Sequence, residues 1–231
     1  MRPFARAANT PTMKTKLLAA AKADCIPENA VGMWHIKKIK LAREVTAPKD
    51  GRMVKVPAGT YTQLWRWTRE TVQKRLDSGA GEPGELVMTD SPDELNTHLA
   101  FMLRARGRVL ITGLGLGCVV RGCLANPAVE HVVCIERDTE VIRMVKPHMP
   151  DRCTVIQADA VRWARNNLPR QRFDCAWHDL WSDPDKDEPH LAVTHSSLFV
   201  ACHGAVQFQG AWAFPKPQKR LWQQTVGGII A

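Results

Sequence analysis

Three glycines and one acid near the middle of the chain have the spacing of a ligand-binding site. Gly113, Gly115 and Gly117 come directly after the β-branched segment 109–112. A glycine loop after a strand lets the backbone turn sharply and approach a ligand closely, because no Cβ stands in the way. Glu136 ends the next apolar run along the chain, where an acid can accept hydrogen bonds from both hydroxyls of a ribose. The spacing predicts a site for a nucleoside-bearing ligand.

The order of the glycines narrows the kind of ligand. The dinucleotide fingerprint GxGxxG needs a glycine where this chain has Cys118, and the triphosphate motif GxxxxGK[ST] does not occur. A GxGxG loop followed by a ribose acid resembles the loop of class I S-adenosylmethionine-dependent enzymes. We therefore expect S-adenosyl-L-methionine as the cofactor. The alternative is a glycine-rich turn that binds no ligand.

Two further polar sites follow apolar segments. Segment 153–158 leads into Asp159, and segment 173–177 leads into His178 and Asp179. Ligands of open parallel sheets bind outside the carboxyl ends of the strands, so these residues are expected beside the glycine loop and the ribose acid. Either His178 or Asp179 could take a proton from an acceptor. The alternative for His178 is a histidine packed at the end of its strand.

The elements that must position these residues alternate along the chain. We expect strands at 85–90, 109–112, 131–135, 153–158, 173–177 and 205–211, and helices at 92–106, 138–148, 161–168 and 189–202. This alternation predicts an α/β fold with a doubly wound, Rossmann-like parallel sheet and helices on both faces. We assign residues 85–231 to a cofactor-binding domain of this type.

Residues 1–84 have a different pattern, and we interpret them as a small basic appendage. A helix is expected at 13–23, a β-hairpin built from 34–41 and 52–65, and a short helix at 68–76. The segment 78–84, rich in glycine, is the expected linker between the two domains. Residues 1–12 are expected to be disordered.

The charge of the chain is distributed unevenly. The net charge is +9, but residues 1–75 hold 16 Lys and Arg against 5 Asp and Glu, a balance of +11, and the remainder has a balance of −2. Basic residues near Tyr61, Trp65 and Trp67 could bind nucleic acid, which is one expected class of partner. A solvated basic face and aromatic packing between elements are the alternatives.

The composition indicates a cytoplasmic protein that does not cross a membrane. No apolar run approaches the roughly 20 residues that span a bilayer, and the N-terminus lacks the apolar core of a secretion signal. The seven cysteines include no CxxC pair, which is typical of reduced thiols. The acidic run from Asp183 to His190 begins like a calcium-binding loop, but Glu188 replaces the required glycine, and we expect no metal.

From residue 85 to residue 211 the chain resembles class I S-adenosylmethionine-dependent methyltransferases, and most closely their spermidine-synthase-like branch. The resemblance implies that the loop glycines face the amino-acid part of the cofactor, Glu136 its ribose, Asp159 its adenine and Asp179 the transferred group. The implied cofactor-binding residues are Gly113, Leu114, Gly115, Gly117, Glu136, Arg137, Asp159, Ala160 and Asp179. Asp179 and His178 are the implied catalytic residues.

Three functions remain open, and methyl transfer to a small-molecule or macromolecular acceptor is our first prediction. At the two corresponding places, the motifs of aminopropyltransferases resemble G-G-G-[DE]-G and D-S-S-D-P. This chain has GLGLG at the first place and, at the second, a motif one residue longer that runs from Asp179 to Pro184. A polycationic substrate would also be repelled by the basic N-terminal third unless local acids dominate. A second amine-binding acid beside Asp179 would favour aminopropyl transfer. The third function is a non-catalytic nucleic-acid-binding module with a vestigial pocket.

The C-terminal edge of the sheet bears on assembly. The segment 214–231 that follows Ala213 is too short for the helix and antiparallel hairpin that complete this superfamily's sheet. Either the predicted hairpin near 34–65 takes their place, or a partner chain covers the edge, which predicts a homodimer.

Overall fold

The fold is built around a parallel sheet, and the computed structural model describes it together with most of the chain: residues 12–49, 52–78, 84–180, 197–202, 204–211 and 229–230. Its strands are β7 (Gly107–Thr112), β8 (Val129–Glu136), β9 (Cys153–Gln157), β10 (Phe173–His178), β11 (Val206–Ala211) and β12 (Ile229–Ile230). Their order is β12-β11-β10-β7-β8-β9, and neighbouring strands are parallel. The order of the strands reverses between β7 and β10, where such sheets bind ligands. The predicted doubly wound, Rossmann-like α/β fold is confirmed.

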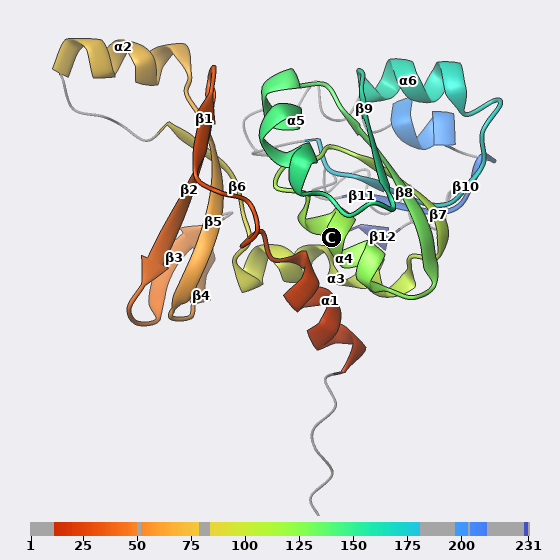
Figure 1. Cartoon of the computed structure of the whole chain (residues 1–231), viewed down its shortest axis with the longest axis horizontal. Coiled ribbons are helices and arrows are strands. Elements are labelled where there is room, and N and C mark those ends of the chain that lie inside the picture. Colours follow the sequence, from red (N-terminus) through yellow and green to blue (C-terminus); the bar gives the residue numbers. More distant parts are fainter. Residues whose placement is uncertain are drawn as a thin grey trace, which may run out of the picture.

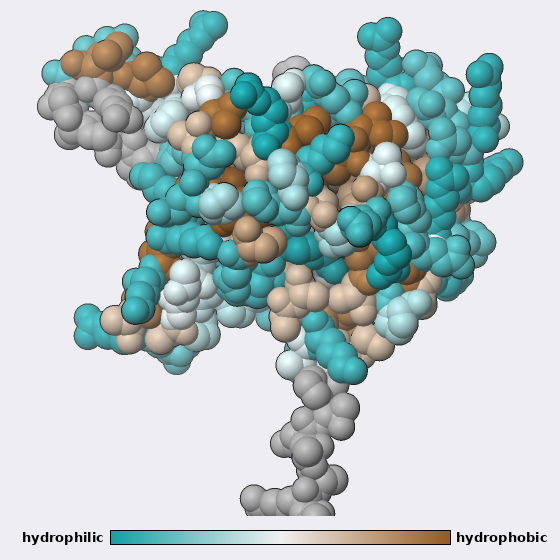
Figure 2. Space-filling model, in the orientation of Figure 1, coloured by the Kyte–Doolittle hydropathy of each residue, from teal (hydrophilic) through white to brown (hydrophobic). Residues whose placement is uncertain are grey.

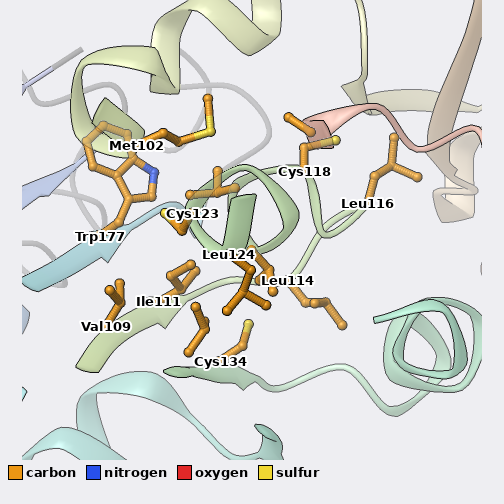
Figure 3. Packing of buried hydrophobic residues seen from close by; sticks show 14 of the residues in the cluster. Met102, Val109, Ile111, Leu114, Leu116, Cys118, Cys123, Leu124, Cys134 and Trp177 are labelled. Carbon is orange, nitrogen blue, oxygen red and sulfur yellow. The ribbon is translucent and has the colours of Figure 1, made fainter. Parts of the chain in front are cut away.

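Helices pack on both faces of this sheet (Figure 1). One face carries α3 (Pro92–Arg104), α4 (Cys118–Ala125) and α5 (Thr139–Val145), with the 3-10 turn η1 (Lys146–His148), and the other carries α6 (Ala160–Asn167) and the helical residues 197–202. Successive strand residues enter opposite apolar clusters: Val109 and Ile111 face α4, whereas Leu110 faces α6. Figure 3 shows the first cluster, where Trp177 and Met102 lie beside Cys123 of α4.

Burial of the apolar residues leaves a mainly hydrophilic surface. In Figure 2, hydrophilic residues cover most of the visible face, and the apolar residues form small separate patches. No helix within the described ranges is both long enough and apolar enough to span a membrane.

The N-terminal helix α1 (Met13–Ala21) is part of the core of the parallel-sheet unit. It packs against α3 and α4, and its Leu17 and Ala21 side chains are fully buried in the same apolar cluster. The buried guanidinium of Arg121 on α4 donates to the backbone carbonyl of Lys22, just after the helix ends. The segment that we assigned to a separate appendage therefore also stabilises the helices behind the glycine loop.

A second, antiparallel sheet follows α1. Its strands are β1 (Asn29–Val31), β2 (Trp34–Leu41), β5 (Gly59–Arg66) and β6 (Glu85–Thr89), in the order β1-β2-β5-β6. The remaining elements of this region are α2 (Arg69–Ser78) and a separate two-stranded ribbon of β3 (Val45–Lys49) and β4 (Arg52–Val56). We predicted one hairpin instead. Segment 52–65 divides into β4 and β5 because Pro57 lacks the N–H needed to continue a strand ladder.

Strand pairing differs from the sequence analysis at two places. Strand β6, which we assigned to the cofactor-binding domain, pairs with β5 in the antiparallel sheet. The strands from residues 34–66 do not extend the parallel sheet, where β12 instead pairs with β11 at that edge. Residues 1–11, most of the predicted linker and most of the predicted helix 189–202 lie outside the described residues.

The buried carboxylate of Asp90 joins three segments at the junction of the two sheets. Its oxygens accept hydrogen bonds from the backbone N–H of Ala23 at 2.9 Å and of Thr62 at 2.8 Å. The ammonium group of Lys22 lies 3.1 Å from the same carboxylate, which has no exposed surface. One side chain therefore holds together the end of α1, strand β5 and the start of α3.

Replacement of Asp90 by alanine is expected to destabilise the protein strongly. The Asp90→Ala variant leaves two buried N–H groups without their acceptor and the Lys22 ammonium without its carboxylate partner, so the free energy of unfolding should fall by about 3 kcal/mol or more. Urea denaturation measures this change. Glu70→Ala is the matched control, because it removes an exposed ion pair with Lys74 and should cost less than about 0.5 kcal/mol. Equal losses in the two variants would contradict the role of Asp90.

Candidate functional site

A cavity of about 380 Å³ lies at the carboxyl ends of the parallel strands. It opens between the parallel sheet and the antiparallel sheet, which supplies Trp34, Leu64, Arg66, Val87 and Met88 to its wall. The predicted residues that line it are Gly113, Gly115, Glu136, Arg137, Asp159, Ala160 and Asp179. The sheet therefore brings together residues that are far apart in the sequence.

The glycine loop leaves no room for side chains on its inner surface. Gly113 has φ +96° and Gly115 has φ +48°, both in the region that favours glycine. A Cβ on Gly113 would collide with the backbone oxygen of Asp179, and one on Gly115 would lie 2.5 Å from the Sδ atom of Met88. The loop after β7 thus packs directly on the backbone that follows β10. Gly117 precedes α4 and is not among the cavity-lining residues.

The carboxylate of Glu136 is held by two backbone N–H groups. Its Oε2 atom accepts from Leu114 at 2.9 Å, and its Oε1 atom accepts from Asp138 at 2.8 Å. The predicted residue Leu114 therefore contacts this acid through its backbone, while its side chain is buried in the core. Each carboxylate oxygen has a second lone pair, so the fixed carboxylate can still accept hydrogen bonds from a ligand.

Asp159 and Ala160 mark the start of α6 beside the cavity. The Oδ1 atom of Asp159 accepts from the backbone N–H of Arg162 at 2.9 Å, which is a helix-capping bond. The Oδ2 atom of the same carboxylate is an acceptor that this capping bond does not use. Asp159 thus has a structural role as a cap together with a position at the site.

Asp179 comes directly after β10 and lies in the cavity wall. Its backbone N–H donates to the carbonyl of Thr112 at 2.9 Å, which fixes it beside the end of β7, and its Oδ2 atom lies 3.8 Å from the Nε2 atom of His98. Burial raises the pKa of its carboxyl group from the usual value near 4 to about 8, and the charges of Glu94 and Glu136 add to the shift. Asp179 can therefore hold a proton near neutral pH and release it when a cation binds.

His178 lies apart from the cavity, which differs from its predicted catalytic role. The ring is fully buried, with Nδ1 3.0 Å from the hydroxyl of Thr112 and Nε2 3.5 Å from the amide oxygen of Gln209. Burial lowers the pKa of His178 to about 4, so the ring is neutral at pH 7. The side chain of His178 points away from the cavity because successive residues of a strand face opposite sides of the sheet. As the last residue of β10, His178 faces Phe199 on the α6 side. This placement corresponds to the alternative of a packed histidine.

Glu94 of α3 also lines the cavity, and sequence reasoning missed it. The sequence analysis placed it only within the expected helix 92–106. In the structure its side chain is only 9% exposed, and its charge acts on Asp179. The available signal was its helical position, since Glu94 and His98 are four residues apart on the buried face.

The cavity is acidic although the chain as a whole is basic. Within the described part of the chain, its lining includes the carboxylates of Glu94, Glu136, Asp138, Asp159 and Asp179 and the guanidinium groups of Arg66 and Arg137. Arg66 is itself paired with Glu85 at 2.8 Å. Carboxylates that converge on a partly enclosed space favour a cationic ligand. The acidic run from Asp183 to His190, where we expected no metal, lies outside the described residues.

Comparison with known proteins identifies polyamine aminopropyltransferases as relatives, although no protein-family model matches the chain. The enzyme of Synechococcus sp. (strain JA-3-3Ab) is 28% identical over 196 residues, which cover 73% of this chain and 62% of that protein. Polyamine aminopropyltransferase 1 of Streptomyces coelicolor is 29% identical over 183 residues, or 67% of this chain and 33% of that protein. The chain thus spans between one third and 62% of the length of these two relatives.

Solved structures similar to this chain include spermidine synthase from Thermotoga maritima. The two chains superpose with a TM-score of 0.44 and 20% sequence identity, over 71% of this chain and 54% of that one. A putative caffeoyl-CoA O-methyltransferase from Staphylococcus aureus superposes with a TM-score of 0.35 over 48% of this chain and 50% of that one, at 17% identity.

The relatives correct our first functional prediction. We predicted a methyltransferase, whereas the sequence relatives are named for aminopropyl transfer, so the main prediction is wrong. The same relatives confirm the resemblance to the spermidine-synthase-like branch. Our argument against that branch used the charge of the whole N-terminal third, but the local acids of the cavity dominate at the site.

The raised pKa of Asp179 predicts how its replacement changes stability with pH. Below about pH 4 the aspartic acid is protonated in both the folded and the unfolded chain, and it contributes no pH dependence. Between about pH 4 and pH 8 the unfolded chain releases this proton while the folded chain retains it, so the wild type loses stability as pH rises. Asp179→Asn cannot ionise, and its melting temperature relative to wild type should increase from about pH 5 to about pH 8.

Thermal unfolding of both proteins across this pH range measures the effect. Asp93→Asn is the control, because Asp93 is on the same helix as Glu94 but is not among the cavity-lining residues. A difference between Asp179→Asn and wild type that is constant with pH would show that the Asp179 carboxyl has an ordinary pKa.

Proposed function

We propose that the protein is an aminopropyltransferase, which transfers the aminopropyl group of decarboxylated S-adenosylmethionine to a primary amine of a diamine. The observation that carries the proposal is a second acid, Glu94, beside Asp179 in the same cavity. This is the feature by which the sequence analysis distinguished aminopropyl transfer from methyl transfer. The names of the sequence relatives support the same function.

The cavity has groups suited to each part of the adenosyl substrate. Glu136 is oriented by two N–H groups and has free lone pairs for the ribose hydroxyls. Asp159 and the backbone of Ala160 would bind the adenine edge, as the resemblance implies. Gly113 and Gly115 line the cavity together with Asp179, so the sulfonium and its chain would pass along the loop backbone close to this acid.

The chemistry needs a neutral amine held in line with the carbon beside the sulfonium. The nitrogen lone pair forms a new C–N bond, the C–S bond breaks, and its electron pair leaves with the sulfur as neutral 5′-methylthioadenosine. The attacking nitrogen then loses a proton to the Asp179 carboxylate, which is free to accept it because the carboxyl group has released its own proton on binding of the cationic sulfonium substrate. Because the sulfonium is already activated, positioning of the amine supplies most of the rate enhancement.

The two acids would divide the work on the diamine. Asp179 follows β10 next to the glycine loop, so it would face the reacting amine. Glu94 projects from α3 and would bind the second, non-reacting amine of the diamine as a cation through a charge-assisted hydrogen bond. A site with one acid could orient only one point of such a substrate.

The proposal predicts turnover of a diamine and a specific effect at Glu94. Incubation of the full chain with decarboxylated S-adenosylmethionine and putrescine should yield 5′-methylthioadenosine and the aminopropylated amine in equal amounts, measured by mass spectrometry. Glu94→Gln should raise KM for putrescine at least about tenfold with a smaller change in kcat, since a charged hydrogen bond to the substrate is lost.

Asp93→Asn removes a neighbouring charge outside the cavity and serves as the control, with an expected KM within about twofold of wild type. The absence of 5′-methylthioadenosine from the wild-type reaction would contradict the proposed function. Equal KM values in Glu94→Gln and Asp93→Asn would contradict the assignment of Glu94.

A further inference from the structure

Trp34 joins the antiparallel sheet to the acids of the cavity. It is the first residue of β2, and its half-buried indole ring lines the cavity wall. The indole Nε1–H donates to the Oδ2 atom of Asp138 at 2.7 Å. This is a charge-assisted hydrogen bond between two residues that are far apart in the sequence.

Asp138 links Trp34 to Glu136. Its Oδ1 atom accepts from the backbone N–H of Glu140 at 2.9 Å, which fixes the start of α5. Its own backbone N–H donates to the Oε1 atom of Glu136 at 2.8 Å. Two hydrogen bonds that share the residue Asp138, one to its side chain and one from its backbone, therefore link the indole of Trp34 to the carboxylate at the end of β8.

Other contacts hold the indole in this position. The backbone N–H of Met33, in the turn before β2, donates to the Oε2 atom of Glu140 at 2.9 Å. The guanidinium of Arg66 lies over the Trp34 ring, 5.7 Å from its centroid. The ring is therefore fixed by the α5 side of the parallel sheet and by the adjacent strand β5 of its own sheet.

We propose that Trp34 is a positioning residue of the adenosyl site. Its ring forms the wall of that site contributed by the antiparallel sheet, and its N–H orients Asp138 and, through Asp138, the acid that binds the ribose. This inference rests on the proposed function, because it takes the cavity to hold an adenosyl group. It makes the N-terminal region a component of the nucleoside site.

Calorimetric titration of the full chain with 5′-methylthioadenosine tests the inference. Trp34→Phe keeps an aromatic ring and loses the N–H, so the Kd should rise about tenfold. Trp65→Phe is the matched control: Trp65 is on the same sheet, its N–H donates to Gln63 at 3.0 Å, and it is not among the cavity-lining residues. The control should change the Kd less than about twofold.

Tryptophan fluorescence gives a readout that a purely structural role would not change. Binding of 5′-methylthioadenosine should quench wild type and Trp65→Phe, and the quenching should be smaller in Trp34→Phe. Glu140→Ala removes the hydrogen bond from the backbone N–H of Met33 without changing a cavity-lining residue, and it should weaken binding about threefold. It provides a second variant if Trp34→Phe does not fold.

The outcomes separate this inference from the proposed function. If wild type binds 5′-methylthioadenosine, and Trp34→Phe or Glu140→Ala binds it with the same Kd, the inference about Trp34 is overturned and the proposed function stands. If wild type does not bind 5′-methylthioadenosine, the proposed function is overturned, and the assignment of Trp34 with it.

Discussion

Burial of one carboxyl group close to other carboxylates is the constraint on which the rest of this structure depends. The backbone after β10 packs tightly on the glycine loop, which fixes the position of Asp179. Asp179 is thereby held near Glu94 of α3 and Glu136 of β8. Burial disfavours an ionised Asp179, repulsion by the charges of Glu94 and Glu136 adds to this effect, and the carboxyl group therefore has a pKa of about 8. A cationic ligand relieves this repulsion, and an anionic group would increase it. The folded chain thus pre-organises a site for a cation in a protein that is basic overall.

The rest of the structure keeps this site in place. The parallel sheet supplies the loop and the acids at its strand ends, while the antiparallel sheet closes the other side of the cavity. Asp90 joins the sheets through α1 and β5, and backbone N–H groups orient Glu136. The two sheets are therefore parts of one binding site, although the sequence analysis treated the first as an appendage.

The sequence predicted what local patterns determine. The GxGxG loop, Glu136 and Asp159 each follow a β-branched run, and the parallel fold alone is enough to bring them to one edge. Glu94 and Trp34 were missed because their positions depend on contacts between α3 and β10 and between β2 and α5. Total charge was misleading as well, since the basic excess of the N-terminal third says little about a cavity lined by five carboxylates in the described chain. His178 and Asp179 are adjacent in sequence, but strand alternation turns only the second toward the cavity.

The most direct test of the acidic site compares two sulfonium ligands that differ by one carboxylate. Isothermal titration calorimetry on the wild-type chain would give the Kd of S-adenosylmethionine and of its decarboxylated form under the same conditions. Because the extra carboxylate would approach Glu94 and Asp179, the account predicts that the decarboxylated form binds at least about tenfold more tightly. Equal affinity, or tighter binding of S-adenosylmethionine, would contradict it.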